Sequence, residues 1–162
     1  MNSVRLILKK IEVSDEKRYV SQVMTEEVMR YITGKGLSEP LAERRFEEAL
    51  LMSDTHPNFG IFTVWLKETG EYIGLARMKL ENNGSVEIGY NLLQAYWGKG
   101  YGSEIGSTLM NFLKNMTDRS DVFAIALTDN TASVRIIEKL GLQITDEKRE
   151  DLARVWRIIL RG

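Results

Sequence analysis

Three closely spaced glycines, Gly98, Gly100 and Gly102, come just before a stretch whose apolar spacing predicts a helix. Glycines at these positions leave consecutive backbone N–H groups uncovered, and the start of a helix carries a partial positive charge. A turn with both properties can hold the phosphate groups of a ligand. The alternative is a tight turn that only lets a strand pack closely against the following helix.

The glycine turn lacks the patterns of the common nucleotide-binding loops. The dinucleotide fingerprint needs a glycine where this chain has Ser103, and the strands before the turn are predicted to form antiparallel hairpins. No Walker A motif occurs in the sequence either. A nicotinamide-dependent oxidoreductase is therefore a remote alternative, and ATP or GTP hydrolysis by a P-loop is not indicated.

The elements that must position this turn are predicted from periodicity and turn signals. Strands are expected at 4–11, 61–66, 72–80, 86–93, 122–127, 142–146 and 154–160. Helices are expected after the cap residues Ser14 and Asp15, from Pro40 to about Ser53, over 105–116 and over 130–140. Residues 147–151 are expected to form a charged connection. This order predicts an α/β fold with a mixed sheet, in which 122–127 is parallel to a neighbouring strand.

The composition is that of one globular domain, with 162 residues, 43% hydrophobic and 28% charged. A net charge of −1 does not favour nucleic acid as a partner, and no apolar stretch is long enough to cross a membrane. The sequence contains no cysteine, which excludes disulfides and thiolate nucleophiles and fits a cytoplasmic location. The single histidine, His56, is expected to be solvated, and no metal site is visible.

Two blocks of sequence, 87–104 and 130–142, resemble the GNAT acyl-CoA N-acyltransferases. Within that family the chain is most similar to the RimJ/RimL-like branch, which acetylates protein N-termini and small amines. The resemblance implies one N-acetyltransferase domain over residues 1–162. It also implies a GNAT-like mixed, largely antiparallel sheet of about seven strands, flanked by about four helices, with a splayed central strand pair.

The resemblance further implies acetyl-CoA as co-substrate and assigns residues to it. Backbone groups of a splayed strand would meet the pantetheine arm, backbone amides of the glycine turn would hold the diphosphate, and two residues at a later helix start would lie beside the cofactor's lower arm. In this sequence the strand residues are Tyr90, Asn91 and Leu92, the turn residues are Gly98, Lys99, Gly100, Tyr101, Gly102 and Ser103, and the helix residues are Asn130 and Ser133.

The sequence offers clear candidates for only some of the catalytic groups that the reaction needs. Glu87, at the start of the splayed strand, matches a position at which similar enzymes place the base for the amine, although it is equally compatible with a surface role. The tyrosine or glutamate acids of some relatives are replaced here by Ile137 and Ile125. Ser133 is then the nearest hydroxyl for the leaving thiolate, unless it only bonds to the helix backbone. Tyr90 and Tyr101 are further possibilities.

The expected reaction is direct transfer of an acetyl group to a primary amine in a ternary complex, because no cysteine exists to carry the acyl group. The resemblance implies that the amine is a protein N-terminus or a small molecule, and that about residues 24–40 and 146–153 select it. A monomer or a homodimer is expected. The alternative is a non-catalytic acyl-CoA-binding regulatory module, which would keep the glycine turn and the splayed strand without the acid and base.

Overall fold

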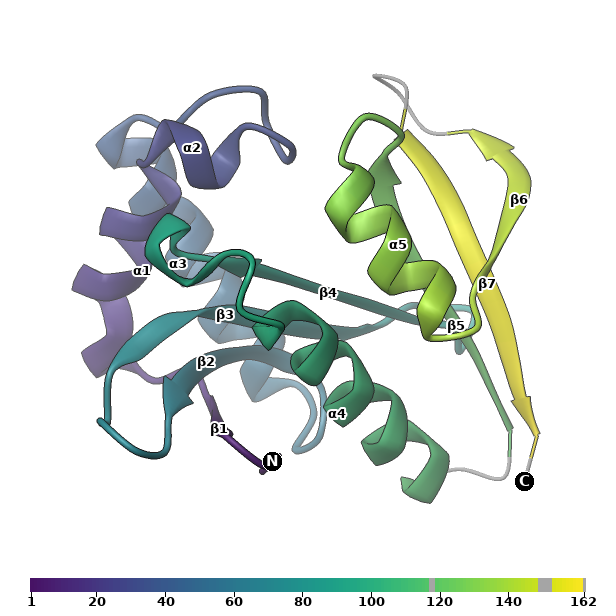
Figure 1. Cartoon of the computed structure of the whole chain (residues 1–162). Coiled ribbons are helices and arrows are strands. Elements are labelled where there is room, and N and C mark those ends of the chain that lie inside the picture. The colour runs from purple at the N-terminus through teal and green to yellow at the C-terminus, as the bar shows by residue number, and fades with distance from the viewer. Residues whose placement is uncertain (117–118, 149–152, 162) are drawn as a thin grey trace.

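The computed structural model describes residues 1–116, 119–148 and 153–161 (Figure 1). The strands are β1 (Leu6–Lys10), β2 (Gly60–Leu66), β3 (Tyr72–Leu80), β4 (Val86–Leu92), β5 (Arg119–Leu127), β6 (Gln143–Lys148) and β7 (Ala153–Arg161). The helices are α1 (Glu16–Val23), α2 (Glu26–Met29), α3 (Glu39–Asp54), α4 (Tyr101–Met116) and α5 (Thr131–Lys139). Short 3₁₀ turns, η1 (Val13–Asp15) and η2 (Gln94–Tyr96), precede α1 and the glycine turn.

One seven-stranded sheet has the order β1-β2-β3-β4-β5-β7-β6. Neighbouring strands are antiparallel except β4 and β5, which are parallel, as predicted for residues 122–127. Only two residue pairs join β4 to β5, Val86 with Val122 and Glu87 with Phe123. Beyond Glu87 the two strands diverge, because β5 follows β7 from Arg119 to Leu127 while β4 stays paired with β3. The splayed central pair is therefore confirmed.

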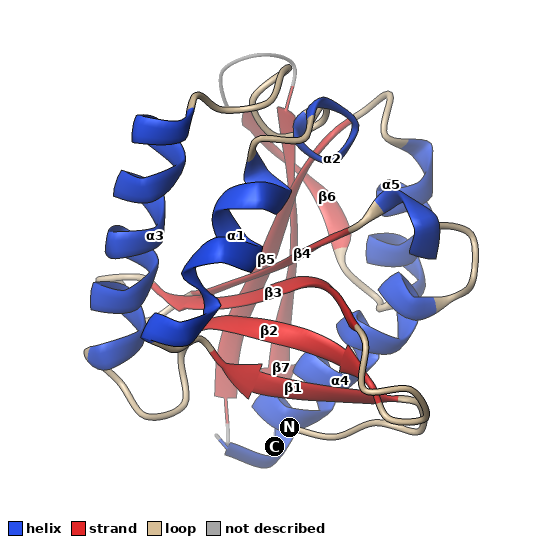
Figure 2. Ribbon diagram, turned by 90° about the vertical axis from the view of Figure 1, so that its left-hand side faces the viewer, coloured by secondary structure: helices blue, strands red, loops and turns tan. Residues whose placement is uncertain are grey.

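Helices cover both faces of the sheet (Figure 2). One face packs against α4, whose Ile105, Leu109 and Leu113 recur at helical spacing and are fully buried. The other face packs against α1 and α3 and forms a separate apolar cluster around Phe46 and Tyr19. Side chains of β4 alternate between these faces, so that Val86 and Ile88 join the α4 core. This alternation decides which residues of β4 can meet at a common site.

The structure differs from the sequence-based expectation in three places. A single-turn helix, α2, adds a fifth helix between the two that were expected before β2. Asp15 ends η1 instead of capping α1 by a side-chain bond; its carboxylate accepts the backbone N–H of Glu12 at 3.0 Å. β6 extends to Lys148, because Lys148 still pairs with Arg154 of β7, so the charged connection is shorter than 147–151. Residues 149–152 of that connection lie outside the described part of the chain.

No helix in the described ranges is long and apolar enough to cross a bilayer. The same residues contain no group of three or more potential metal-ligating side chains.

The segment after α2 is held against α1 at Gly36. A Cβ atom at this position would lie 2.0 Å from the carbonyl oxygen of Met24, so we expect Gly36→Ala to lower the free energy of unfolding by about 1–3 kcal/mol. Gly89→Ala is the matched control, because a Cβ at Gly89 meets nothing within 4 Å. Urea denaturation of both variants measures the difference. Equal midpoints for the two variants would contradict the packing argument.

Candidate active site

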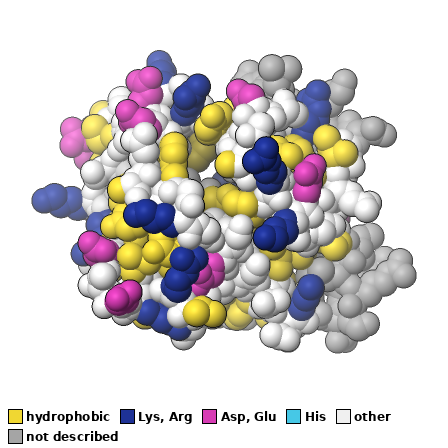
Figure 3. All heavy atoms as spheres, viewed as in Figure 1, with side chains coloured by type: hydrophobic (Ala, Val, Ile, Leu, Met, Phe, Trp, Pro, Cys, Tyr) yellow, Lys and Arg dark blue, Asp and Glu magenta, His cyan; other side chains and the backbone are white. Residues whose placement is uncertain are grey.

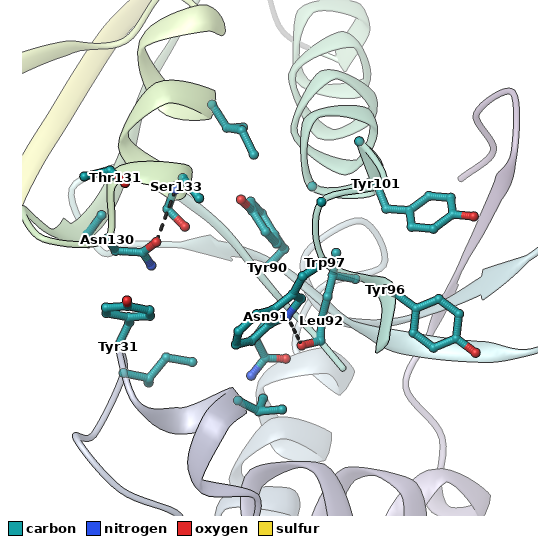
Figure 4. A pocket seen from close by; sticks show the side chains of 18 of the residues that line it. Tyr31, Tyr90, Asn91, Leu92, Tyr96, Trp97, Tyr101, Asn130, Thr131 and Ser133 are labelled. Carbon is teal, nitrogen blue, oxygen red and sulfur yellow. Dashed lines mark hydrogen bonds between the residues drawn. The ribbon is translucent and has the colours of Figure 1, made fainter. Parts of the chain in front are cut away.

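A cleft of about 460 Å³ opens where β4 and β5 separate. Its walls come from the end of β4, the glycine turn, the start of α5 and the α2 segment (Figure 4). In the space-filling view this region is a hollow that contains apolar side chains, with Lys and Arg side chains nearby (Figure 3). Residues predicted for a ligand that line it are Tyr90, Asn91, Leu92, Gly98, Gly100, Tyr101, Gly102, Asn130 and Ser133. Glu87, Lys99 and Ser103 are not in its lining.

The glycines of the turn are required for two different physical reasons. Gly98 and Gly100 have φ angles of +71° and +81°, a conformation that residues with a side chain rarely adopt. Gly102 instead allows close packing, because a Cβ there would lie 2.8 Å from the ring of Tyr90. The turn therefore fixes both its own backbone and the position of Tyr90.

The backbone N–H groups of residues 98–103 have no hydrogen-bond partner among the described residues. The first backbone hydrogen bond of this segment runs from the N–H of Glu104 to the carbonyl of Gly100, at 3.1 Å. These free donors lie at the start of the 16-residue helix α4, where its dipole is positive. This arrangement can bind an anionic phosphate group.

Arg5, the residue just before β1, contacts the glycine turn and the helix that follows it. Its backbone N–H and its guanidinium each donate to the Glu104 carboxylate at 2.7 Å, and the guanidinium also donates to the carbonyl of Lys99 at 3.1 Å. Burial raises the pKa of Glu104, but its hydrogen bonds from Ser3 and Arg5 together outweigh this effect and lower the pKa below the ordinary value. The Glu104 carboxylate is thus ionised, and the Arg5 guanidinium balances its charge beside the turn.

Tyr90 and Ser133 bring two hydroxyl groups together inside the cleft. Tyr90 extends from β4 toward Ser133 on α5, so that both hydroxyl groups lie in the cleft (Figure 4). Burial raises the pKa of Tyr90 above its ordinary value of 10.0, although the nearby Ser133 side chain lowers it in part. Tyr90 therefore keeps its proton at neutral pH and can act as a donor.

Asn130 and Trp97 use their side chains to hold the walls of the cleft. The Asn130 side chain caps α5 by accepting the backbone N–H of Ser133 at 3.3 Å. The indole N–H of Trp97 donates to the carbonyl of Leu92 at 2.8 Å, at the end of β4. Both side chains thereby fix the backbone of the segments from which the cleft is built.

Glu87 lies outside the cleft, on the β4 face that packs toward α1 and α3. Its carboxylate is 14% exposed and forms an ion pair with Arg77 of β3 at 2.5 Å. Tyr90 lies three residues further along β4 and on the opposite face, because side chains alternate along a strand. Glu87 therefore lies on the same face of β4 as Asn91, although it is not in the lining of the cleft.

Residues 5–143 match the family described as Acetyltransferase (GNAT) domain. This match covers most of the chain and agrees with the observed strand order and splay. The chain belongs to the GNAT acetyltransferase family. An uncharacterized N-acetyltransferase p20 of Bacillus licheniformis is 26% identical over 141 residues, which are 86% of this chain and 79% of that protein.

Two solved GNAT-type structures illustrate the fold match. An acetyltransferase from Salmonella typhimurium, described as modifying the N-terminal serine of ribosomal protein L7/L12, has a TM-score of 0.76 at 16% identity, with 97% of this chain and 96% of that chain covered. A spermidine N-acetyltransferase from Vibrio cholerae, in complex with CoA and spermine, has a TM-score of 0.77 at 17% identity, with 96% of each chain covered. At these identities the likeness shows the shared fold.

As a GNAT enzyme, the protein is an N-acetyltransferase that uses acetyl-CoA, which favours the catalytic interpretation over the regulatory module. The free amides of residues 98–103 fit the diphosphate of this GNAT substrate. Ile125 lines the cleft and Ile137 is buried in the core, so neither position supplies an acid.

The sequence pointed broadly to residues 24–40 and 146–153 for acceptor selection. Residues 149–152 of the second range lie outside the described part of the chain, so that this part of the expectation stays untested. The structure identifies Val28, Tyr31 and Ile32 as the members of the first range that line the cleft. Helix α2 has a single turn, too short for a periodic apolar pattern to reveal it in the sequence.

Proposed function

We propose that this protein transfers an acetyl group from acetyl-CoA directly to a primary amine in a ternary complex, as a RimJ/RimL-like N-acetyltransferase formed by residues 1–162 as one domain. One observation supports this most strongly. A single continuous cleft joins the free amides of the glycine turn to the hydroxyl groups of Tyr90 and Ser133 and to the α2 wall. Donor and acceptor can therefore occupy the same cavity together.

The donor side of the cleft would hold acetyl-CoA through backbone groups. N–H groups of residues 98–103 would bind the diphosphate, and backbone groups of Tyr90, Asn91 and Leu92 would bind the pantetheine arm. The start of α5, with Asn130 and Ser133, would lie beside that arm. When bound, acetyl-CoA supplies an activated thioester carbonyl to the amine.

The chemistry requires movement of one proton as one bond forms and another breaks. The amine nitrogen forms a bond to the acetyl carbon, and the carbon–sulfur bond breaks. Glu87 accepts the amine proton through water in the gap between β4 and β5, because its carboxylate does not line the cleft. Tyr90, supported by Ser133, donates a proton or hydrogen bond to the departing thiolate.

Removal of the Tyr90 hydroxyl tests this donor role. We expect Tyr90→Phe to lower kcat about tenfold, with a smaller loss for Ser133→Ala, because Tyr90 remains a donor when Ser133 is absent. Because burial raises the pKa of Tyr90 above 10.0, the wild-type kcat should not decline from loss of this proton until the pH exceeds that value. Steady-state thiol release from pH 6 to 10.5 measures both effects. Unchanged kcat in Tyr90→Phe would remove the assigned role.

Calorimetry with acetyl-CoA, followed by thiol release against peptides, polyamines and aminoglycosides, tests the function as a whole. Saturable binding and amine-dependent thiol release are expected. Binding without release against any amine would instead support the regulatory module. Absence of binding would contradict the assignment of the cleft to acetyl-CoA.

A further inference from the structure

Gln22 is a fully buried polar residue of α1, with 1% of its surface exposed. Its side-chain amide contacts two residues of the sheet. The Nε2 group donates to the backbone carbonyl of Asn91 at 3.1 Å and to the side-chain Oδ1 of Asn91 at 2.5 Å. The Oε1 atom accepts the Tyr72 hydroxyl at 2.5 Å. Every part of the Gln22 amide is therefore engaged.

The orientation of this amide follows from the partners. A backbone carbonyl only accepts hydrogen bonds, so the end of Gln22 that meets the Asn91 carbonyl must be the NH₂ group. The opposite end is then an acceptor and needs a donor, which Tyr72 provides. Burial, followed by the charge of Asp15, raises the pKa of Tyr72, so that its hydroxyl keeps the proton it donates.

Gln22 in turn fixes the orientation of the Asn91 side chain. Because the Gln22 NH₂ group faces it, the Asn91 oxygen Oδ1 must point to Gln22, and the Nδ2 group must point away. Asn91 lines the cleft, and its Nδ2 donates no hydrogen bond to any part of the chain that the structure describes. Figure 4 shows the Asn91 amide below Trp97, with its nitrogen toward the side of the cleft where Tyr31 lies.

The face of β4 on which Asn91 lies determines which part of a substrate its Nδ2 group can contact. Tyr90 points to α5, the side assigned to the thioester, whereas Asn91 points to the α1 and α2 side, where Val28 and Tyr31 complete the cleft. An N–H donor held there, among apolar and aromatic groups, suits an oxygen of the acceptor.

We propose that the Asn91 side chain donates a hydrogen bond to the carbonyl oxygen next to the acceptor amine, with Gln22 as its positioning residue. The preferred acceptor is then an α-amino acyl group, as at a peptide N-terminus, and not an alkyl amine. This inference rests on the proposed function. An alkyl amine has no carbonyl oxygen to accept from Asn91. In a closed site the Asn91 N–H group would then lose its contact with water and gain no hydrogen bond in return, which disfavours such an amine.

The test compares leucinamide with isoamylamine, two amines with the same side chain that differ only in the carboxamide group, which supplies the carbonyl oxygen next to the amine. Each rate is divided by the wild-type rate for the same amine, so their different basicities cancel. We expect Asn91→Asp, which replaces the donor by an acceptor, to lower kcat/KM for leucinamide about tenfold or more beyond any loss for isoamylamine. Gln22→Met should give a smaller loss with the same selectivity. Asn111→Asp, on the exposed face of α4, is the control and should change neither rate.

Equal losses for both amines would overturn the inference, because they would place Asn91 on the acetyl group or in the fold. No loss with Asn91→Asp would overturn it as well, and that variant decides the matter if Gln22→Met does not fold. Absence of turnover by the wild-type protein with every amine, in a preparation that binds acetyl-CoA, would overturn the proposed function and this inference with it.

Discussion

Gly100→Val should weaken acetyl-CoA binding by about 100-fold or more. Valine does not adopt the φ of +81° found at this position without strain, so the turn must rearrange and its N–H groups no longer converge. Each hydrogen bond from an amide to a charged phosphate contributes about 1.5–3 kcal/mol, and loss of two accounts for that factor. Calorimetric titration of acetyl-CoA into the purified variant measures the dissociation constant.

Gly70→Val provides a matched control for this prediction. Gly70 has a similar φ of +71°, lies in the turn between β2 and β3, and has no neighbour within 4 Å of an added Cβ. Both substitutions should cost about 1–3 kcal/mol of stability through backbone strain, but only Gly100→Val should lose acetyl-CoA. Equal affinities in the two variants would show that the glycine turn does not hold the substrate.

Glu87→Gln should lower kcat/KM by about 10²–10⁴ at neutral pH, the usual contribution of a positioned general base. Glutamine keeps the shape of the side chain but cannot accept the amine proton. The defect should shrink as the pH rises past the amine pKa, about 8 for a peptide N-terminus, because solvent then supplies the free amine. Thiol release measured from pH 6 to 9.5 gives this profile.

Two controls distinguish a role of Glu87 as the base from a role in its ion pair with Arg77. Glu81→Gln removes a carboxylate just after β3 that pairs with Lys79 at 2.8 Å, and it should leave activity intact. Arg77→Gln breaks the ion pair from the other side and keeps the Glu87 carboxylate, so it should lose far less activity than Glu87→Gln. If Glu87→Gln behaves like Glu81→Gln, then Glu87 has only a surface role.

The sequence predicted the fold well because its signals are local. Alternation in 72–80 and 86–93 and helical spacing from Ile105 to Leu113 each follow from which face is buried, and the structure has β3, β4 and α4 there. The glycines of the turn were also visible as residues. The different reasons for which these positions need glycine were not visible in the sequence, because the contact of Gly102 with Tyr90 depends on how α4 lies against β4.

The contacts of Gln22 show why the rest of the site was hidden. Its partner Asn91 is 69 positions away in the chain, and its other partner Tyr72 is 50 positions away. A lone glutamine in a short helix gives no local sign of such a role. Likewise, the sequence placed Glu87 on the splayed strand, but only the structure shows its ion pair with Arg77 and the face from which it must act.

Because β4 and β5 are paired over so short a length, a small rotation between the two parts of the sheet is enough to move their far ends apart. The sheet is divided into β1–β4 and β5–β7, and within the described residues the strand pairing between the two parts is limited to Val86 with Val122 and Glu87 with Phe123. From Glu87 to Leu92, five residues further along, β4 is roughly 17 Å long. A rotation of about 5° at Glu87 then displaces the far end by roughly 1.5 Å, half the length of a hydrogen bond. We therefore expect a change in core packing around Val86 and Val122 to alter the width of the cleft.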